Sequence, residues 1–512
     1  MWTEPRRHLI PVALAALVLA GPAVATTPMS AIDWLSKSVM AAPGVPEVAA
    51  PVGIPPAEGI DVQTLGLQQL DATGLVTAEA SGLPADLWVA SRTGDLVQLL
   101  QAEPQHLLPA LQDLLDTLLL VEARPPADSG ASGGFLLARV DRLLEQGALD
   151  PAAALLQQAG VHQPALFRRW FDVELLLGQE QAACKAMAET PEIAPTLPAR
   201  IFCLARTGDW GAAALTLQSA KALGMLQPEN AAVLTRFLDT GGDDSATPLP
   251  PPAHPTPLVW RMMEAVGEPL PTNTLPLAFA QADLRANTGW KAQVVAAERL
   301  ARAGAIQANQ LIGVYSQGRP SASGDPWDRV AAVQALDKAV TARDAAAVSR
   351  ALPPAWSAMS AAGLQVTLAR LYGKAVAGMK LGGNAAEIAF RLALLSPDAA
   401  TLAGNRVAAN PTEAFLIGLA RGQITGLTPP DEMGAAIMAG FAPGAQPSVD
   451  VQTMLDAHRT GEAILHAINR IADGAQGDLR GVTEGIATLH AARLDDAARK
   501  IAIQLMLVAR AG

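Results

Sequence analysis

The sequence has 512 residues, of which 50% are hydrophobic and only 4% aromatic, and alanine and leucine are its commonest apolar types. Such a high apolar content excludes general disorder, and the scarcity of aromatic residues favours packed helices over a β-sandwich or barrel. The formal net charge of −11 disfavours nucleic acid or an anionic lipid surface as the principal partner.

The first 25 residues have the pattern of a secretory signal peptide. Arginines occupy positions 6 and 7, an apolar run follows over residues 9–20, and residues 23–25 (Ala-Val-Ala) offer the small side chains of a cleavage site. The apolar run is shorter than the ~20 residues that a membrane-spanning helix needs. We therefore expect cleavage after Ala25, a periplasmic location and no transmembrane segment in the mature chain. An uncleaved N-terminal anchor is the alternative.

Residues 26–82 are expected to form one short amphipathic helix followed by a flexible linker rich in proline and alanine. The helix places four candidate partner-docking side chains close together: Ile32, Trp34, Leu35 and Val39. A helix this short is unstable alone in water, so it must pack on something. That surface is either the body of this chain or a partner, for which tryptophan is a favoured anchor.

Residues 83–240 are expected to form a helical-repeat domain. Gly147, Gly178 and Gly208 are separated by 31 and then 30 residues, and each follows a leucine-containing run and precedes a second apolar run. Small residues come four and five positions after each glycine. This spacing predicts helical hairpins that turn at glycine and bring their helices close together.

The segment 205–210 (Ala-Arg-Thr-Gly-Asp-Trp), with Ala220 twelve residues after Gly208, resembles tetratricopeptide repeats. Residues 30–36 and 82–88 (Gly-Leu-Pro-Ala-Asp-Leu-Trp), together with the helical C-terminus, resemble uncharacterised exported proteins of alphaproteobacteria. These resemblances imply a helical-hairpin architecture and export. They imply no binding residue and no activity.

The second half of the chain is divided by segments that cannot be helical. Residues 241–257 contain six prolines and predict a linker or long loop. Helical patterning then predicts a middle helical domain over 258–441, a loop over 442–449 and C-terminal helical hairpins over 450–512.

The two cysteines, Cys184 and Cys203, are expected to form a disulfide. The proline-rich connection 190–198 lies between them, and each cysteine is nine or ten residues from its centre at Ala194. In an antiparallel hairpin the two would therefore stand level with each other, and an exported protein enters an oxidising compartment. Two buried thiols or a redox role are the alternatives, although no Cys-x-x-Cys motif is present.

The sequence contains no catalytic signature among the nucleophile elbow, the zinc-protease helix, the phosphate-binding loop and the dinucleotide-binding loop. No two of the six histidines beyond residue 25 are spaced three or four apart, so no helical metal clasp is expected. Asp113 and Asp116 would suit acid–base chemistry only if buried with a positioned partner. Arg168 and Arg169, beside Trp170, suit either an anion site or a solvated edge.

These observations favour a periplasmic helical-repeat scaffold or adaptor that binds a protein or peptide partner, without a cofactor, a metal or catalytic activity. Stacked hairpins form extended concave surfaces that suit this role. The alternative is a cell-envelope enzyme or carbohydrate-binding factor whose site is assembled from residues scattered along the chain.

Overall fold

The computed structural model describes residues 69–239 and 247–508, and helices make up most of both stretches. In this part of the chain two short strands, β1 (Val76–Thr77) and β2 (Val121–Glu122), pair in parallel. The expected all-α architecture of stacked helical hairpins is confirmed. The expected signal peptide 1–25, the segment around Trp34 and part of the expected linker 241–257 lie outside the described residues.

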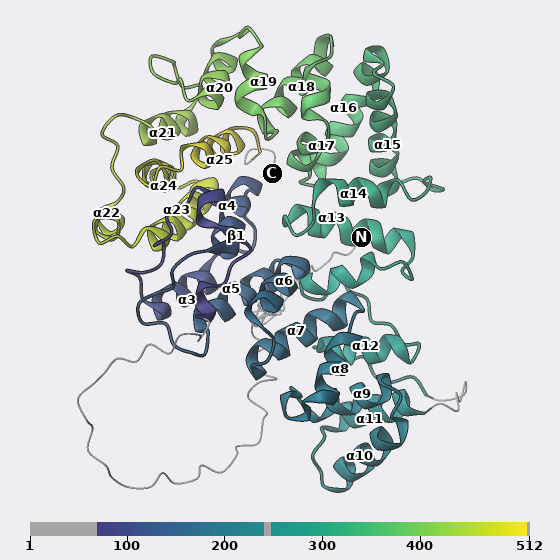
Figure 1. The fold of residues 1–512 in the computed structure, drawn as a ribbon. Coiled ribbons are helices and arrows are strands. Elements are labelled where there is room, and N and C mark those ends of the chain that lie inside the picture. Colours follow the sequence, from purple (N-terminus) through teal and green to yellow (C-terminus); the bar gives the residue numbers. More distant parts are fainter. Residues whose placement is uncertain (1–68, 240–246, 509–512) are drawn as a thin grey trace, which may run out of the picture.

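The helices form four groups along the chain (Figure 1). The N-terminal group comprises η1 (Leu70–Ala72), α2 (Ala78–Ser81), α3 (Thr93–Ala102), α4 (Pro109–Leu120), α5 (Gly134–Glu145) and α6 (Leu149–Ala159). The second group, called the lobe from here on, comprises α7 (Pro164–Leu177), α8 (Gln181–Glu189), η2 (Pro191–Ile193), α9 (Leu197–Arg206), α10 (Trp210–Ala222), α11 (Pro228–Leu238) and α12 (Pro257–Ala265).

The middle group comprises η3 (Leu277–Leu284), α13 (Trp290–Arg302), α14 (Ala308–Tyr315), α15 (Trp327–Thr341), α16 (Ala345–Ala361), α17 (Gln365–Ala377), α18 (Gly383–Leu395), α19 (Ala399–Gly404) and α20 (Pro411–Arg421). The C-terminal group comprises α21 (Glu432–Gly440), α22 (Val449–Asp456), α23 (Thr460–Ala475), α24 (Leu479–Ala491) and α25 (Asp495–Leu507). Among the described residues, no helix is both long enough and apolar enough to cross a membrane.

The three glycines of the expected repeat lie at the turns between α5 and α6, α7 and α8, and α9 and α10. Their φ angles are 75° at Gly147, 73° at Gly178 and 94° at Gly208, a left-handed region that glycine adopts without steric cost. At Gly147 an added Cβ would lie 2.9 Å from the side chain of Leu300. The glycine therefore both turns the hairpin and lets the middle group approach it.

The folded body begins earlier than the expected Leu83. Leu70 and Asp71 are buried, and β1 pairs with β2. The expectation of a flexible linker up to residue 82 is therefore wrong for residues 69–82, which pack on the N-terminal group.

A buried arginine explains this packing. The Arg139 side chain of α5 donates hydrogen bonds to three carbonyl oxygens: Thr73 at 2.7 Å, Leu119 at 2.7 Å and Val121 at 3.0 Å. These bonds satisfy carbonyl oxygens after η1, in the last turn of α4 and in β2, and so join the segment before α3 and the end of α4 to one side chain. An arginine within a helical pattern usually lies at a solvent-facing position, so no local pattern indicates this role for Arg139.

The two ends of the described chain meet. Helix α4 packs against α25 and α23, and Figure 1 shows the first helices beside the last ones. The backbone N–H of Ala110 donates to Oε1 of Gln504 at 2.8 Å, and the N–H of Gly461 donates to the carbonyl oxygen of Leu87 at 3.2 Å. The ring of Trp88 lies directly against Gly461, where a side chain would collide with it. The stack of hairpins is thus closed on itself rather than open.

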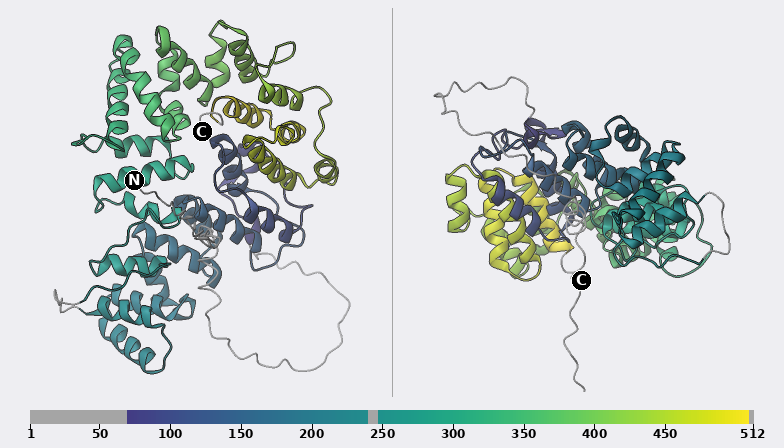
Figure 2. Two further views of the ribbon diagram at one scale, coloured as in Figure 1. Left: turned by 180° about the vertical axis from the view of Figure 1, so that it is seen from behind. Right: turned by 90° about the horizontal axis from the view of Figure 1, so that it is seen from below.

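The lobe extends away from this closed part, as the left view of Figure 2 shows. A disulfide joins Cys184 of α8 to Cys203 of α9, which confirms the expected pairing. The buried carboxylate of Glu180 accepts hydrogen bonds from Arg206 of α9 at 2.6 Å and from Arg261 of α12 at 3.2 Å. Helix α12 therefore packs with α7 and α11, across the proline-rich segment that separates it from them in sequence.

Candidate functional site

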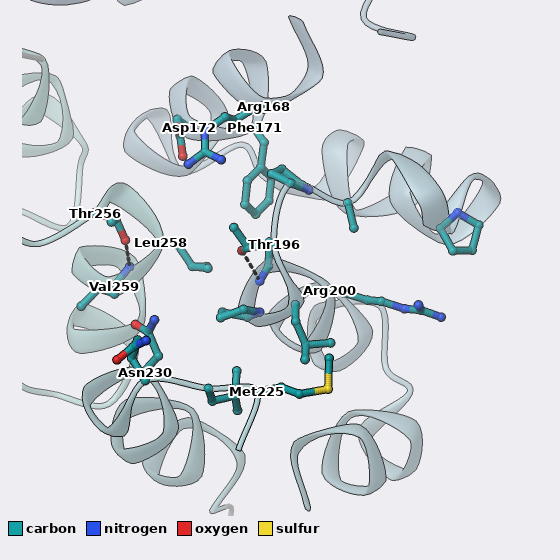
Figure 3. A pocket seen from close by; sticks show the side chains of 18 residues that line it. Arg168, Phe171, Asp172, Thr196, Arg200, Met225, Asn230, Thr256, Leu258 and Val259 are labelled. Carbon is teal, nitrogen blue, oxygen red and sulfur yellow. Dashed lines mark hydrogen bonds and ion pairs between the residues drawn. The ribbon is translucent and has the colours of Figure 1, made fainter. Parts of the chain in front are cut away.

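A groove with a volume of about 680 Å³ lies on the lobe, between α7, the α8–α9 connection and the first residues of α9, α11 and α12 (Figure 3). We call it the lobe groove. Its size is typical of a site for a small molecule or a short peptide segment. Apolar side chains form much of its wall: Phe171, Leu197, Met225, Leu226, Leu258 and Val259.

Helix-start signals in the sequence explain why three helices begin at this groove. Each has a proline in its first two positions, at Pro198 in α9, Pro228 in α11 and Pro257 in α12, where the fixed φ of proline suits a helix start. Thr196 and Thr256 cap α9 and α12, and each hydroxyl accepts a backbone N–H at 3.2 Å. The positive ends of three helix dipoles therefore face one cavity.

The disulfide supports the same groove. The connection between α8 and α9 contributes Pro191, Ala194 and Pro195 to its lining, and the Cys184–Cys203 bond joins the two helices that carry this connection. Both cysteines are buried. The cross-link thus holds one wall of the groove in place.

Arg168 and Asp172 stand at one end of the lobe groove, one turn apart on α7 (Figure 3). Each residue is only 7% exposed, and their Nε and Oδ2 atoms are 4.0 Å apart, too far for a hydrogen bond. Among the described residues, neither of these two atoms has a hydrogen-bond partner. Buried polar atoms are normally hydrogen-bonded. These two are closed off from solvent and held only by a loose ion pair, so a ligand in the groove would meet the other donors of the Arg168 guanidinium.

Burial sets the protonation of this pair. It raises the pKa of the Asp172 carboxyl to about 7, although the nearby charges of Arg168 and Arg169 oppose the shift. Burial also lowers the pKa of the Arg168 guanidinium. Asp172 can therefore gain or lose its proton near neutral pH when its surroundings change.

The two neighbouring arginines of the sequence have different roles. Arg169 donates to both carboxylate oxygens of Asp141, at 2.5 and 2.7 Å, and so joins α7 to α5. Arg168 instead lines the lobe groove. The solvated edge that the sequence allowed is wrong for both arginines, since Arg168 is buried and Arg169 is held in an ion pair. An anion site at Arg168 stays a prediction.

The second candidate pair from the sequence, Asp113 and Asp116, lines a different cavity. This junction cavity has a volume of about 560 Å³ and lies where α4, α14, α17, α18 and α25 meet. Asp113 forms an ion pair with Arg370 at 2.5 Å, and Asp116 accepts a hydrogen bond from Gln112 at 2.8 Å. Burial raises the pKa of Asp116 to about 7. Gln112 is a near neighbour on α4, but the sequence showed neither the burial of Asp116 nor the pairing of Asp113, because Arg370 and the helices around the cavity come from positions far along the chain.

Exposed apolar side chains lie on α10 and on the turn that leads from α10 to the lobe groove. Residues 210–225 contain four large apolar side chains whose exposed fractions lie between 43% and 73%: Trp210, Leu215, Leu223 and Met225. Met225, 58% exposed, also lines the groove. Apolar residues lie on all sides of α10, so the sequence pattern did not show which of them would face outward.

The other expected positions add no site. The docking candidates Ile32, Trp34, Leu35 and Val39 lie outside the described residues, and their role stays a prediction. Within residues 69–239 and 247–508, no cluster of three or more histidine, cysteine or acidic side chains is arranged to hold a metal ion.

Comparison of the chain with protein-family models, with curated proteins and with solved structures found no match. Inferences about function therefore rest on the geometry of the chain itself.

Proposed function

We propose that this protein is a periplasmic helical-repeat scaffold or adaptor that binds a protein or peptide partner in the lobe groove. The observation that carries this proposal is the groove itself, which combines an apolar wall with two buried polar side chains that each leave one atom unpartnered. Apolar walls with a few placed polar groups are the usual composition of binding sites.

The exposed apolar side chains of residues 210–225 support a macromolecular partner. A small ligand would fit within the groove and leave the exposed apolar side chains of residues 210–225 uncovered. One of these, Leu223, is 73% exposed. Clustered exposed apolar residues commonly mark protein interaction sites. A partner polypeptide could cover both surfaces at once.

Two observations support the periplasmic location. The N-terminal sequence has the pattern of a cleaved signal peptide, and the chain contains a disulfide, a bond that persists in oxidising compartments. Intact-mass analysis of the protein from a periplasmic fraction should give a chain that begins at Thr26. A full-length chain in the membrane fraction would contradict the proposal.

Selection of binders from a random peptide library, followed by calorimetric titration, tests the binding role. The double variant Leu223→Glu and Met225→Glu should weaken the selected peptides at least tenfold, because charges replace apolar contacts beside the groove. Val407→Glu is the matched control, since Val407 is 92% exposed and lies between α19 and α20, outside the lobe. A selection that yields no binder, or binders that only the control variant weakens, would refute the proposal.

The junction cavity favours a second candidate function, that of a cell-envelope enzyme. Asp116, with a pKa of about 7 beside Asp113 and Arg370, is suited to general acid–base chemistry. A hydrolysis screen of envelope polymers with the wild type and Asp116→Asn would test it. Turnover that the substitution abolishes supports an enzyme, and equal turnover by both proteins rules out this site.

A further inference from the structure

Three helix N-termini and one buried arginine share the lobe groove. The groove is lined by residues 196–200 at the start of α9, by Gln227 and Asn230 at the start of α11, and by Thr256, Leu258 and Val259 at the start of α12. Each of these helices has at least nine residues, so each carries a developed dipole with its positive end toward the cavity. The groove is therefore locally positive in a protein whose overall charge is negative.

The arginine gives independent evidence that this positive end is a binding site. Arg168 is more than nine-tenths buried and its Nε has no hydrogen-bond partner among the described residues. Its guanidinium lies at the groove, beside Phe171 and opposite Leu258 in Figure 3. Asp172 offsets this charge only through the 4.0 Å ion pair and makes no hydrogen bond to Nε, so an acceptor that bonds the guanidinium would stabilise the buried cation.

We propose that the lobe groove captures the free C-terminal carboxylate of a partner polypeptide whose last residues are apolar. This inference rests on the proposed function and names what the site recognises. The carboxylate would accept hydrogen bonds from Arg168 at the positive end of the groove, while the last side chains pack on the apolar wall formed by Leu226, Leu258 and Val259.

The details of the helix starts favour a carboxylate over a phosphate group. Each of the three helices has lost one N–H donor to proline, and in α9 and α12 a threonine hydroxyl already occupies another. Few backbone donors thus remain for the several oxygens of a phosphate, which in other proteins binds to rows of free N–H groups. One arginine and the positive ends of the helix dipoles suit a ligand whose single negative charge is joined directly to an apolar group.

Asp172 makes the capture depend on pH. In its protonated form the carboxyl can donate a hydrogen bond to the incoming carboxylate, whereas in its ionised form it repels it. The charges that act on Asp172 are those of Arg168 and Arg169 on the same helix, and Arg200 of α9 lines the same groove. Because the pKa of Asp172 is about 7, the affinity for a carboxylate should fall as the pH rises through neutrality.

Fluorescence anisotropy with paired peptides tests the inference on the intact mature protein. The probes are fluorescein-labelled octapeptides whose last four positions are randomised among Ala, Val, Leu and Phe, prepared once as free acids and once as C-terminal amides. The wild type should bind the acids at least tenfold more tightly than the amides at pH 6. Arg168→Gln should abolish this difference, and Arg350→Gln, at an exposed position of α16, should keep it.

A second variant keeps the test decisive if Arg168→Gln fails to fold. Asp172→Asn should keep the preference for acids and remove its decrease between pH 6 and pH 8. Equal binding of acids and amides by the wild type would overturn the inference but leave the proposed function standing. Failure of every peptide to bind would overturn both. Binding of decanoate as tightly as the best peptide acid would overturn the inference in favour of a fatty-acid site.

Discussion

Glu103 should make the protein less stable as the pH rises, and Glu103→Gln should reverse much of this loss. Glu103 follows α3 and is buried at the contact between the first and last helices, where its Oε1 accepts a hydrogen bond from Asn469 of α23 at 3.3 Å. Its Oε2 has no partner among the described residues. Burial raises the pKa of this carboxyl from 4.5 to about 8, against a smaller opposing effect of Arg142.

The sign follows from proton linkage. Below about pH 4.5 the carboxyl is protonated in both the folded and the unfolded chain, so its stabilising contribution is fully present. Between about pH 4.5 and 8 only the folded chain keeps the proton, and the free energy of unfolding falls with each unit of pH. At about 1.4 kcal/mol per unit, the whole window corresponds to at most about 5 kcal/mol. Above pH 8 this group adds no further dependence.

Urea unfolding followed by tryptophan fluorescence at pH 5, 6.5 and 8 measures the effect. Glutamine keeps the acceptor for Asn469 but cannot ionise, so Glu103→Gln should raise the free energy of unfolding by about 2 to 4 kcal/mol at pH 8 and by little at pH 5. Glu229→Gln, at an exposed position of α11, is the matched control and should change neither value. A variant that is less stable than the wild type at pH 8 would show that the reasoning about this carboxyl is wrong.

Three further substitutions test the packing. Gly461→Ala should lower the melting temperature because its methyl group would collide with Trp88, whereas Gly211→Ala, in open space on α10, should leave it unchanged or slightly higher. Glu180→Gln should lower the free energy of unfolding by about 2 kcal/mol, because it removes the charge that two partly buried arginines share. A denaturant titration that shows no loss of stability would mean that this ion-pair network is dispensable. Cys203→Ser should lower the free energy of unfolding by ~2 to 4 kcal/mol and weaken peptide binding, because the groove wall loosens. Unchanged peptide binding would show that the disulfide does not support the groove.

Short-range signals in the sequence predicted the helical hairpins and the disulfide. Glycine turns at fixed spacing and two cysteines equidistant from a proline-rich connection are local patterns, and the structure confirms both. Other hairpins turn at residues other than glycine, at Arg343 with a φ of 52° and at Arg493 with a φ of 62°.

The closure of the stack and the lobe groove could not be predicted in the same way. Threonine and proline at the starts of α9 and α12 indicate where two helices begin, but not that they converge on α7. The burial of Arg168 and Arg139 also depends on residues far along the chain, whereas an arginine in a helical pattern ordinarily lies at the surface. These features depend on contacts between residues that are far apart in the sequence, and local sequence patterns do not reveal such contacts.

Site-specific photocrosslinking in intact cells tests the central claim, that the lobe groove binds a partner polypeptide. A photoreactive amino acid at Met225, which is exposed and lines the groove, is compared with the same amino acid at Val407, which is exposed outside the lobe. The account predicts a discrete adduct with a polypeptide at position 225 and none at position 407. Its yield should fall when Arg168→Gln is added. No adduct at position 225, or equal adducts at both positions, would contradict the account.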